Sequence, residues 1–386
     1  MFTLIKGAEV FAPDRLGKRD ILIAGSKIAK IADALDIPDA LDVRVIQAHD
    51  RYLTPGFIDL HVHIMGGGGE GGFKSRTPEI RLSSIVLAGV TTVAGCLGTD
   101  DITRSPEALL AKAMQLDEEG VSTVIYTGSY QFPPTTITGS VRKDIALIPK
   151  VIGVGEFAIS DHRSSQPTYE EFCRLAAEAR VGGMMGGKAG VVHLHVGDGV
   201  RRLEYLLRAV EETEIPISQF LPTHITRTEE LLEQAVEFAR LGGNIDITAA
   251  PDMLGFGSGV DKAIGLALNG NVSPDQITLS SDSNGSLPIF DSHGRLERLA
   301  VAHIGSLFRE FRNLVHIGYP MQDVLRWVAT NPAKRLGLFK HKGSIDEGKD
   351  ADLLLLTPDL EIDAVFARGR QMVKGGEAVV KGTFEE

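Results

Sequence analysis

The stretch PGFIDLHVH, residues 55–63, decides the fold because it joins a strand signal to a pair of histidines. Apolar residues dominate from Phe57 onward, which predicts a buried strand over residues 57–63. Successive side chains of a strand point to opposite faces, so His61 and His63 share a face and can bind one ion. The stretch therefore predicts a metal site at the carboxyl end of a strand.

The long middle of the chain alternates strand and helix signals. Helices are expected over Pro78–Ala88, after the capping residue Ser105, and after Thr168, which has capping-box spacing to Glu171. Eight strands alternating with helices predict an α/β fold, a (β/α)8 TIM barrel. The predicted strands are residues 57–63, 91–97, 121–126, 151–157, 191–196, 217–223, 245–248 and 276–281.

Both ends of the chain have short strand signals instead. Two runs around Gly25-Ser26 form a hairpin pattern, and the apolar runs 351–356 and 364–372 are separated by a turn. These ends predict one small β-sandwich domain built from both termini. The expected domains are 1–54 with 344–386 for the β-sandwich, and 55–343 for the barrel.

The composition excludes several classes of protein. The net charge of −11 has no basic cluster beside it, which argues against a nucleic-acid partner. We expect no secretory signal and no contact with a membrane, because no apolar run approaches the ~20 residues that span a bilayer. Cys96 and Cys173 are too few and too distant for a disulfide framework, so both are expected to be reduced core residues of a cytoplasmic protein.

Polar residues follow several of the other predicted strands. His195 ends the fifth strand, His224 follows the sixth and Asp282 ends the eighth. The carboxyl ends of barrel strands converge on one pocket, so these residues are expected to join His61 and His63 there. Neutral imidazoles with a carboxylate suit zinc or a similar divalent ion.

The remaining histidines carry weaker signals, because a single histidine is more often a packed or solvated side chain. His193 lies two residues before His195 on the same strand face and is expected one layer deeper in the core. Five others fall in loop or helix patterns without a partner: His49, His293, His303, His316 and His341.

These motifs resemble the amidohydrolase superfamily. Residues 55–63 are similar to its opening signature, and 343–353 resemble its return into a β-sandwich. Within the superfamily the chain resembles the bacterial isoaspartyl (β-aspartyl) dipeptidases, nearly from end to end. The stretches that carry this closer resemblance are 66–70, 97–100, 137–141, 158–163, 221–224 and 280–286.

The resemblance implies hydrolysis of β-aspartyl dipeptides at a centre of two divalent ions, with zinc expected. A hydroxide bridging the metals would attack the side-chain amide carbonyl, because a divalent ion polarises the carbonyl and lowers the pKa of bound water. The implied ligands are His61, His63 and Asp282 for one metal, and His195 and His224 for the other.

Further roles follow from the same resemblance. Asp282 would move the proton from the hydroxide to the leaving amine, and Tyr130 would stabilise the oxyanion. Glu70 would bind the α-ammonium of the substrate, with Gly68 and Thr99 beside it. The groups for the substrate carboxylates would be Arg163, Arg227 and Ser286, and the forked guanidinium of arginine suits a carboxylate.

One position departs from the pattern of this family. Isoaspartyl dipeptidases bridge their metals with a carbamylated lysine, whereas the matching residue here, seven before Arg163, is Glu156. A glutamate also presents two oxygens, on a shorter stem, and a buried acid needs a partner for its charge. Three outcomes are open: a bridging Glu156 in a two-metal site, one tight and one weak metal, or a changed chemistry. We favour the first.

The sequence leaves three hypotheses for the function. The leading hypothesis is a β-aspartyl dipeptidase that acts on a small-molecule dipeptide. A related amidohydrolase acting on another N-acyl amino acid or a cyclic amide is the second, and a non-catalytic paralogue is the third. The resemblance also implies a homo-oligomer.

Overall fold

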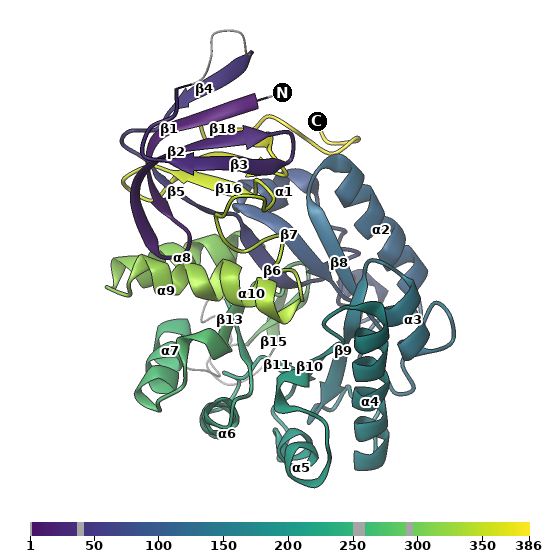
Figure 1. Ribbon diagram of the computed structural model, residues 1–386. Coiled ribbons are helices and arrows are strands. Elements are labelled where there is room, and N and C mark those ends of the chain that lie inside the picture. The colour runs from purple at the N-terminus through teal and green to yellow at the C-terminus, as the bar shows by residue number, and fades with distance from the viewer. Residues whose placement is uncertain (1, 37–41, 250–258, 291–295) are drawn as a thin grey trace.

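Strands from the two ends of the chain pair in one nine-stranded sheet (Figure 1). The computed structural model describes residues 2–36, 42–249, 259–290 and 296–386. The sheet order is β19-β18-β17-β16-β5-β1-β2-β3, and β4 pairs with β1. The strands are β1 Phe2–Phe11, β2 Arg15–Ala24, β3 Lys27–Ala32, β4 Val43–Gln47, β5 Tyr52–Pro55, β16 Leu353–Leu356, β17 Ile362–Ala367, β18 Arg370–Lys374 and β19 Glu377–Ala378.

This β-rich region has an apolar core of its own. Ile5 and Ile21 from the start of the chain pack with Leu353 and Phe366 from its end, and all four are almost fully buried. Pairing of β5 with β16 brings Leu53 opposite Leu355. The predicted pairing of the two chain ends is therefore observed, and the hairpin between β2 and β3 turns at Gly25 as expected.

All eight strands expected in the middle of the chain are present. Six form a parallel sheet in chain order, and the last two form a separate parallel pair. The six are β6 Phe57–Val62, β7 Val90–Gly95, β8 Ser122–Thr127, β9 Val151–Ile159, β10 Val191–Val196 and β11 Phe220–Thr223, and the pair is β12 Ile245–Thr248 and β13 Ile277–Ser280. These strands support the coarse expectation of an α/β barrel-type fold beside a β-rich region.

Helices surround the parallel strands (Figure 1). Ser105 and Thr168 cap α2 and α4 through their side chains, and Thr168 forms the expected capping box with Glu171. The helices are α1 Leu82–Leu87, α2 Pro106–Glu119, α3 Val141–Leu147, α4 Tyr169–Gly186, α5 Glu204–Glu212, α6 Glu229–Arg240, α7 Val260–Asn269, α8 Gly305–His316, α9 Met321–Leu325 and α10 Asn331–Arg335.

Helix α1 is shorter than expected. The sequence predicts a helix over Pro78–Ala88, but the helix begins at Leu82. The preceding residues are occupied by tertiary hydrogen bonds, because Ile80 donates its backbone N–H to Ile64 and Pro78 accepts from the side chain of Asn284. The end of the helix agrees with the prediction, since Gly89 follows it with a φ of 71°.

Side chains join β11 to β12, where the described strands form no backbone ladder. The buried carboxylate of Asp246 on β12 accepts hydrogen bonds from Thr223 on β11 at 2.7 Å and from Ser280 on β13 at 2.6 Å. On the other side, Ser281 N donates to Asp59 of β6 at 3.2 Å, and His63 N donates to Ser283 O at 2.8 Å. The two-stranded pair is therefore tied to both edges of the six-stranded sheet.

A β-hairpin of β14 Ser286–Phe290 and β15 Leu296–Val301 follows β13. His293, expected in a loop, lies outside the described residues. Cys96 is fully buried as expected, whereas Cys173 on α4 is only partly buried. Among the described residues, no helix has the length and apolarity needed to cross a membrane.

Candidate metal centre

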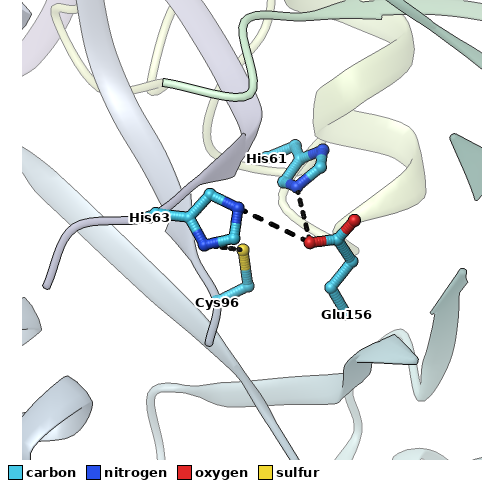
Figure 2. Close-up of side chains that lie close together, drawn as sticks. All are labelled: His61, His63, Cys96 and Glu156. Carbon is cyan, nitrogen blue, oxygen red and sulfur yellow. Dashed lines mark hydrogen bonds and ion pairs between the residues drawn. The ribbon is translucent and has the colours of Figure 1, made fainter. Parts of the chain in front are cut away.

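Six buried side chains converge at the carboxyl ends of the parallel strands. They come from β6, β9 and β10 and from residues within two positions after β6, β11 and β13, and none of these residues is more than 8% exposed. Figure 2 shows three of them, with His61 and His63 turned toward the carboxylate of Glu156. The six are His61, His63, Glu156, His195, His224 and Asp282.

Glu156 lies at the centre of this group, and each of its oxygens faces a different pair of histidines. Oε2 lies 3.1 Å from His61 Nε2 and 3.5 Å from His63 Nε2. Oε1 lies 2.7 Å from His195 Nδ1 and 3.2 Å from His224 Nε2. A carboxylate placed in this way can bind one cation through each oxygen.

Asp282 completes the arrangement from the opposite side. Its Oδ1 lies 3.1 Å from His63 Nε2 and 3.4 Å from His61 Nε2. Asp282 and His224 both have left-handed backbone conformations, with φ values of 51° and 60°. Such conformations are uncommon outside glycine and concentrate at functional sites, where the surrounding structure maintains them.

The electrostatics of the group require positive charge. Burial lowers the pKa of His61, but the carboxylates of Glu156 and Asp282 outweigh it and raise that pKa well above its usual value. Burial acts in the opposite sense on Asp282, and His61 and His63 nevertheless lower its pKa to about 2. Both carboxylates are therefore ionised, and His61 and His63 hold protons whose positive charge a divalent cation would replace.

Hydrogen bonding tests whether a metal fits these residues. Glu156 Oε2, His61 Nε2 and Asp282 Oδ1 are buried and receive no hydrogen bond from any residue that the structure describes. Buried charged atoms without partners are costly, and coordination to a cation removes that cost. Four imidazoles with two carboxylates form a donor set that suits zinc and related divalent ions, so the residues fit.

Neighbouring groups hold several of these histidines. Cys96 Sγ lies 3.7 Å from His63 Nδ1, which leaves Nε2 directed at the carboxylates (Figure 2). His224 Nδ1 contacts Thr248 Oγ1 at 2.9 Å, and Asp59 accepts from the backbone N–H of His61. Cys96 is thus buried as expected, but it contacts a candidate ligand, which its apolar sequence context does not indicate.

His193 lies below the group, as expected from its place on β10. Its ring is 4.6 Å from that of His61 and is stacked on Tyr126 at 4.9 Å. Burial holds the pKa of His193 well below its usual value, so its imidazole is neutral. His193 therefore packs against a candidate ligand and lies outside the cluster centred on Glu156.

The residues expected to bind substrate form a second cluster beside the first. Glu70 accepts hydrogen bonds from Thr99 Oγ1 at 3.0 Å, Arg163 Nη1 at 3.2 Å and Ser286 Oγ at 3.2 Å. Gly68 lies in the same loop, where its φ of 71° and the nearby carbonyl of Ser75 leave no room for a side chain. Three loops and the first residue of β14 thus bring a carboxylate, a guanidinium and two hydroxyls together.

Tyr130 and Arg227 both contact His195 of the first cluster. The Tyr130 hydroxyl lies 2.6 Å from His195 Nδ1, and Arg227 Nη2 lies 3.2 Å from His195 Nε2. Burial and the charge of Glu156 raise the pKa of Tyr130 well above its usual value, so the hydroxyl stays protonated and can donate a hydrogen bond. Every residue expected in the site is therefore within the same region of the molecule.

Comparison with known proteins agrees with this geometry. The model of the amidohydrolase family matches residues 52–372, which is most of the chain. The chain belongs to the amidohydrolase family. The β-aspartyl dipeptidase from Fervidobacterium islandicum AW-1, solved in complex with a β-Asp-Leu dipeptide, is 47% identical over 98% of both chains, with a TM-score of 0.91. A second structure from this organism, also of a β-aspartyl dipeptidase, is 45% identical over 98% of both chains, with a TM-score of 0.90.

Curated relatives found by sequence are more distant. The dihydroorotase of Staphylococcus aureus strain MRSA252 is 30% identical over 158 residues, or 41% of this chain and 35% of the dihydroorotase. The match spans about a third of that relative's length. The solved structures therefore confirm the resemblance to β-aspartyl dipeptidases, and the chain is an enzyme of the amidohydrolase family with dipeptidases as structural neighbours.

Sequence reasoning missed one residue of this amidohydrolase, Asp161. It lies within the stretch 158–163 that supports the family resemblance, but its role depends on contacts that the stretch alone does not reveal. Burial would raise the pKa of Asp161, but hydrogen bonds from His195 and Arg163 hold it well below the usual range. A charged, buried carboxylate thus lies between a candidate metal ligand and a candidate substrate-binding arginine.

Proposed function

We propose that this amidohydrolase cleaves β-aspartyl dipeptides at a centre of two divalent ions. The arrangement of Glu156 supports this proposal most directly, because each carboxylate oxygen faces its own pair of histidines. The second support is the charge pattern beside it, where Glu70 and Arg163 offer opposite charges to a zwitterionic substrate. The similar structure from F. islandicum contains β-Asp-Leu, a substrate with this charge pattern.

The ligands fall into two groups around Glu156. His61, His63 and Asp282 would hold one ion, and His195 and His224 the other, with Glu156 bound to both. Zinc suits these donors, and a divalent ion supplies a nucleophile at neutral pH together with polarisation of the carbonyl. Burial, assisted by the charge of Arg227, lowers the pKa of His224 to about 3 although Glu156 opposes this, so its imidazole is neutral and has a lone pair to offer.

Two protein groups would carry out the proton transfer and charge stabilisation. Asp282 is ionised at neutral pH, with a pKa of about 2, and can accept a proton from the nucleophile and then donate it to the leaving amine. The protonated Tyr130 hydroxyl can donate a hydrogen bond to the oxyanion that forms on the amide carbonyl. Neither group needs to change its charge state before the reaction begins.

Recognition of the dipeptide would use both charges of the second cluster. The Glu70 carboxylate would bind the α-ammonium group, with Thr99 and Gly68 beside it. Arg163, Arg227 and Ser286 would hold the substrate carboxylates, since planar guanidinium groups form paired hydrogen bonds with carboxylates. In the structure Glu70 and Arg163 contact each other, so a zwitterionic substrate would replace one internal ion pair with two ion pairs of its own.

A substrate panel tests this function. We expect β-Asp-Leu to be hydrolysed and α-Asp-Leu to remain intact, because only the β-linkage presents a free α-ammonium and α-carboxylate beside the scissile amide. Purified enzyme with zinc is incubated with each dipeptide, and released leucine is measured. Cleavage of N-acyl amino acids or cyclic amides alone would favour a different amidohydrolase activity. Metal binding without turnover of any of these compounds would favour a non-catalytic paralogue.

Replacement of Glu70 with glutamine is expected to raise KM for β-Asp-Leu by about 10- to 100-fold, because a charged hydrogen bond to the ammonium is worth about 1.5–3 kcal/mol. Steady-state kinetics would measure this loss. Glu79→Gln serves as the control, since the Glu79 side chain is half exposed and pairs with Lys112, which is outside the site. An unchanged KM in the Glu70 variant would contradict the assignment of Glu70 to the substrate ammonium.

The finer features of the fold belong to the same proposal. We propose that the eight parallel strands close into a barrel over residues 55–343, and that 1–54 and 344–386 form the β-sandwich domain. The hydrogen bonds of Asp246 and Asp59 at the two edges support closure.

We also propose that the protein is a homo-oligomer of the cytoplasm. Gel filtration with light scattering would measure the number of subunits.

A further inference from the structure

One carboxylate, Asp161, contacts both clusters of the site. The backbone turns sharply just after β9, because Ser160 has a left-handed φ of 52°. The turn directs Asp161 back toward the strand ends, where it is only 4% exposed. Gly197 packs directly against it, since a Cβ at that position would lie 2.6 Å from Asp161 Cβ. The loop after β10 thus encloses this side chain.

On one side, Asp161 binds the guanidinium group of Arg163. Oδ1 accepts from Nε at 2.9 Å and Oδ2 accepts from Nη2 at 2.9 Å, while Oδ1 also accepts from the Arg163 backbone N–H at 2.8 Å. Two parallel hydrogen bonds fix the plane of a guanidinium as well as its position. The remaining nitrogen, Nη1, is left to reach Glu70 at 3.2 Å.

On the other side, Asp161 Oδ2 lies 2.9 Å from His195 Nε2. An ionised carboxylate only accepts hydrogen bonds, so at this distance Nε2 carries a proton that Asp161 holds in place. Nδ1 faces Glu156 at 2.7 Å and is then the nitrogen left to bind a metal ion, which would replace any proton there. Two other groups lie near His195 Nε2, namely Arg163 Nη2 at 3.0 Å and Arg227 Nη2 at 3.2 Å. Both are hydrogen-bond donors, so neither can accept the proton of Nε2 in place of Asp161.

From these contacts we infer that Asp161 is a positioning residue that orients a metal ligand and a substrate-binding arginine at the same time. It holds His195 in the tautomer that offers Nδ1 to a metal, and it holds Arg163 flat for a substrate carboxylate. This inference rests on the proposed function for Arg163, whereas its metal half requires only that His195 is a ligand. Removal of the charge should therefore weaken two separately measurable properties.

Asp161→Asn tests the inference. Asparagine has the shape of aspartate, but it is neutral and has one acceptor oxygen, so it cannot bind both His195 and Arg163 as a carboxylate does. Zinc affinity of the metal-free protein is measured by competition with a chromophoric chelator. We expect the weaker-bound ion to dissociate about 10- to 100-fold more readily, the usual effect of losing such a partner of a histidine ligand. We also expect KM for β-Asp-Leu to rise about 10-fold.

Asp144→Asn provides the matched control. Asp144 is a fully buried carboxylate that accepts hydrogen bonds from Thr127 at 2.6 Å and from the backbone of Ile137 and Thr138, none of which belongs to the site. Its loss should lower Tm and leave zinc affinity and KM unchanged. The same result in Asp161→Asn would overturn the inference and assign Asp161 to stability alone.

A second variant keeps the test decisive if Asp161→Asn does not fold. Asp161→Ser is smaller, keeps a hydroxyl acceptor and should show the same loss of zinc affinity. Failure of both variants to fold without metal would also overturn the inference, since Asp161 would then be needed for the fold itself. If the wild-type enzyme binds two zinc ions but leaves β-Asp-Leu intact, the proposed function fails while the zinc affinities still decide the role of Asp161.

Discussion

Glu156→Ala is expected to lower kcat/KM for β-Asp-Leu by about 10⁴-fold and to release at least one of two divalent ions per chain. The variant removes both oxygens that face the two histidine pairs, and a metal ion contributes several kcal/mol of charge stabilisation, each 1.36 kcal/mol being tenfold in rate. Metal content by mass spectrometry and steady-state kinetics measure the two effects. Retention of both ions at full occupancy would show that Glu156 does not bridge them.

Two comparisons sharpen this experiment. Asp20→Asn removes another buried carboxylate, in the β-rich region, where Asp20 accepts from the backbone N–H of Gly7 and Leu35. It should retain both ions. Added bicarbonate should leave wild-type turnover unchanged, because a glutamate presents two oxygens without carbon dioxide. A clear bicarbonate requirement would contradict the bridging role of Glu156.

Asp282→Asn is expected to reduce kcat for β-Asp-Leu by about 10³-fold while KM changes little. Asparagine matches the shape of aspartate but cannot accept and return a proton, and general acid–base catalysis contributes about 10²–10⁴-fold. Metal content is measured in parallel, since Asp282 also faces His61 and His63. A variant with both ions and wild-type kcat would remove Asp282 from the proton transfer.

Ser281→Ala is the neighbouring control for Asp282. Its hydroxyl accepts from the backbone N–H of Ser283, and its side chain is not among the proposed ligands. We expect this variant to keep both ions and a kcat close to that of the wild type. A loss as large as that of Asp282→Asn would indicate disruption of the loop after β13 and not loss of a proton-transfer group.

The positions that the sequence predicts best are those set by local periodicity. His61 and His63 follow from strand alternation, and His195, His224 and Asp282 follow from the rule that barrel strands end at one face. Glu156 required a count of residues from Arg163 in a known family pattern. The structure shows the additional feature that its two oxygens face different histidines, which depends on strand geometry that no sequence motif describes.

Features set by contacts between distant segments could not be predicted. Asp161 reaches His195 because Ser160 turns the chain and Gly197 leaves space beside it, and these residues lie on different loops. Cys96 contacts His63 from the position just after the adjacent strand β7, although its sequence context is simply apolar. The predicted start of α1 at Pro78 was wrong for a related reason. The hydrogen bond from Ile80 to Ile64 overrides the local helical pattern there.

The division of the parallel strands into six and two would give the proposed metal centre a mechanical role. His61, Glu156 and His195 lie on the six-stranded sheet, whereas Asp282 lies two residues after the two-stranded pair β12–β13. An ion bound to His61 and Asp282 would fasten these two units together, in addition to the side-chain and backbone hydrogen bonds that join them. The binding energy of the metal then contributes to the rigidity of the whole scaffold. In this enzyme the proposed reaction centre would thus also join two parts of the fold.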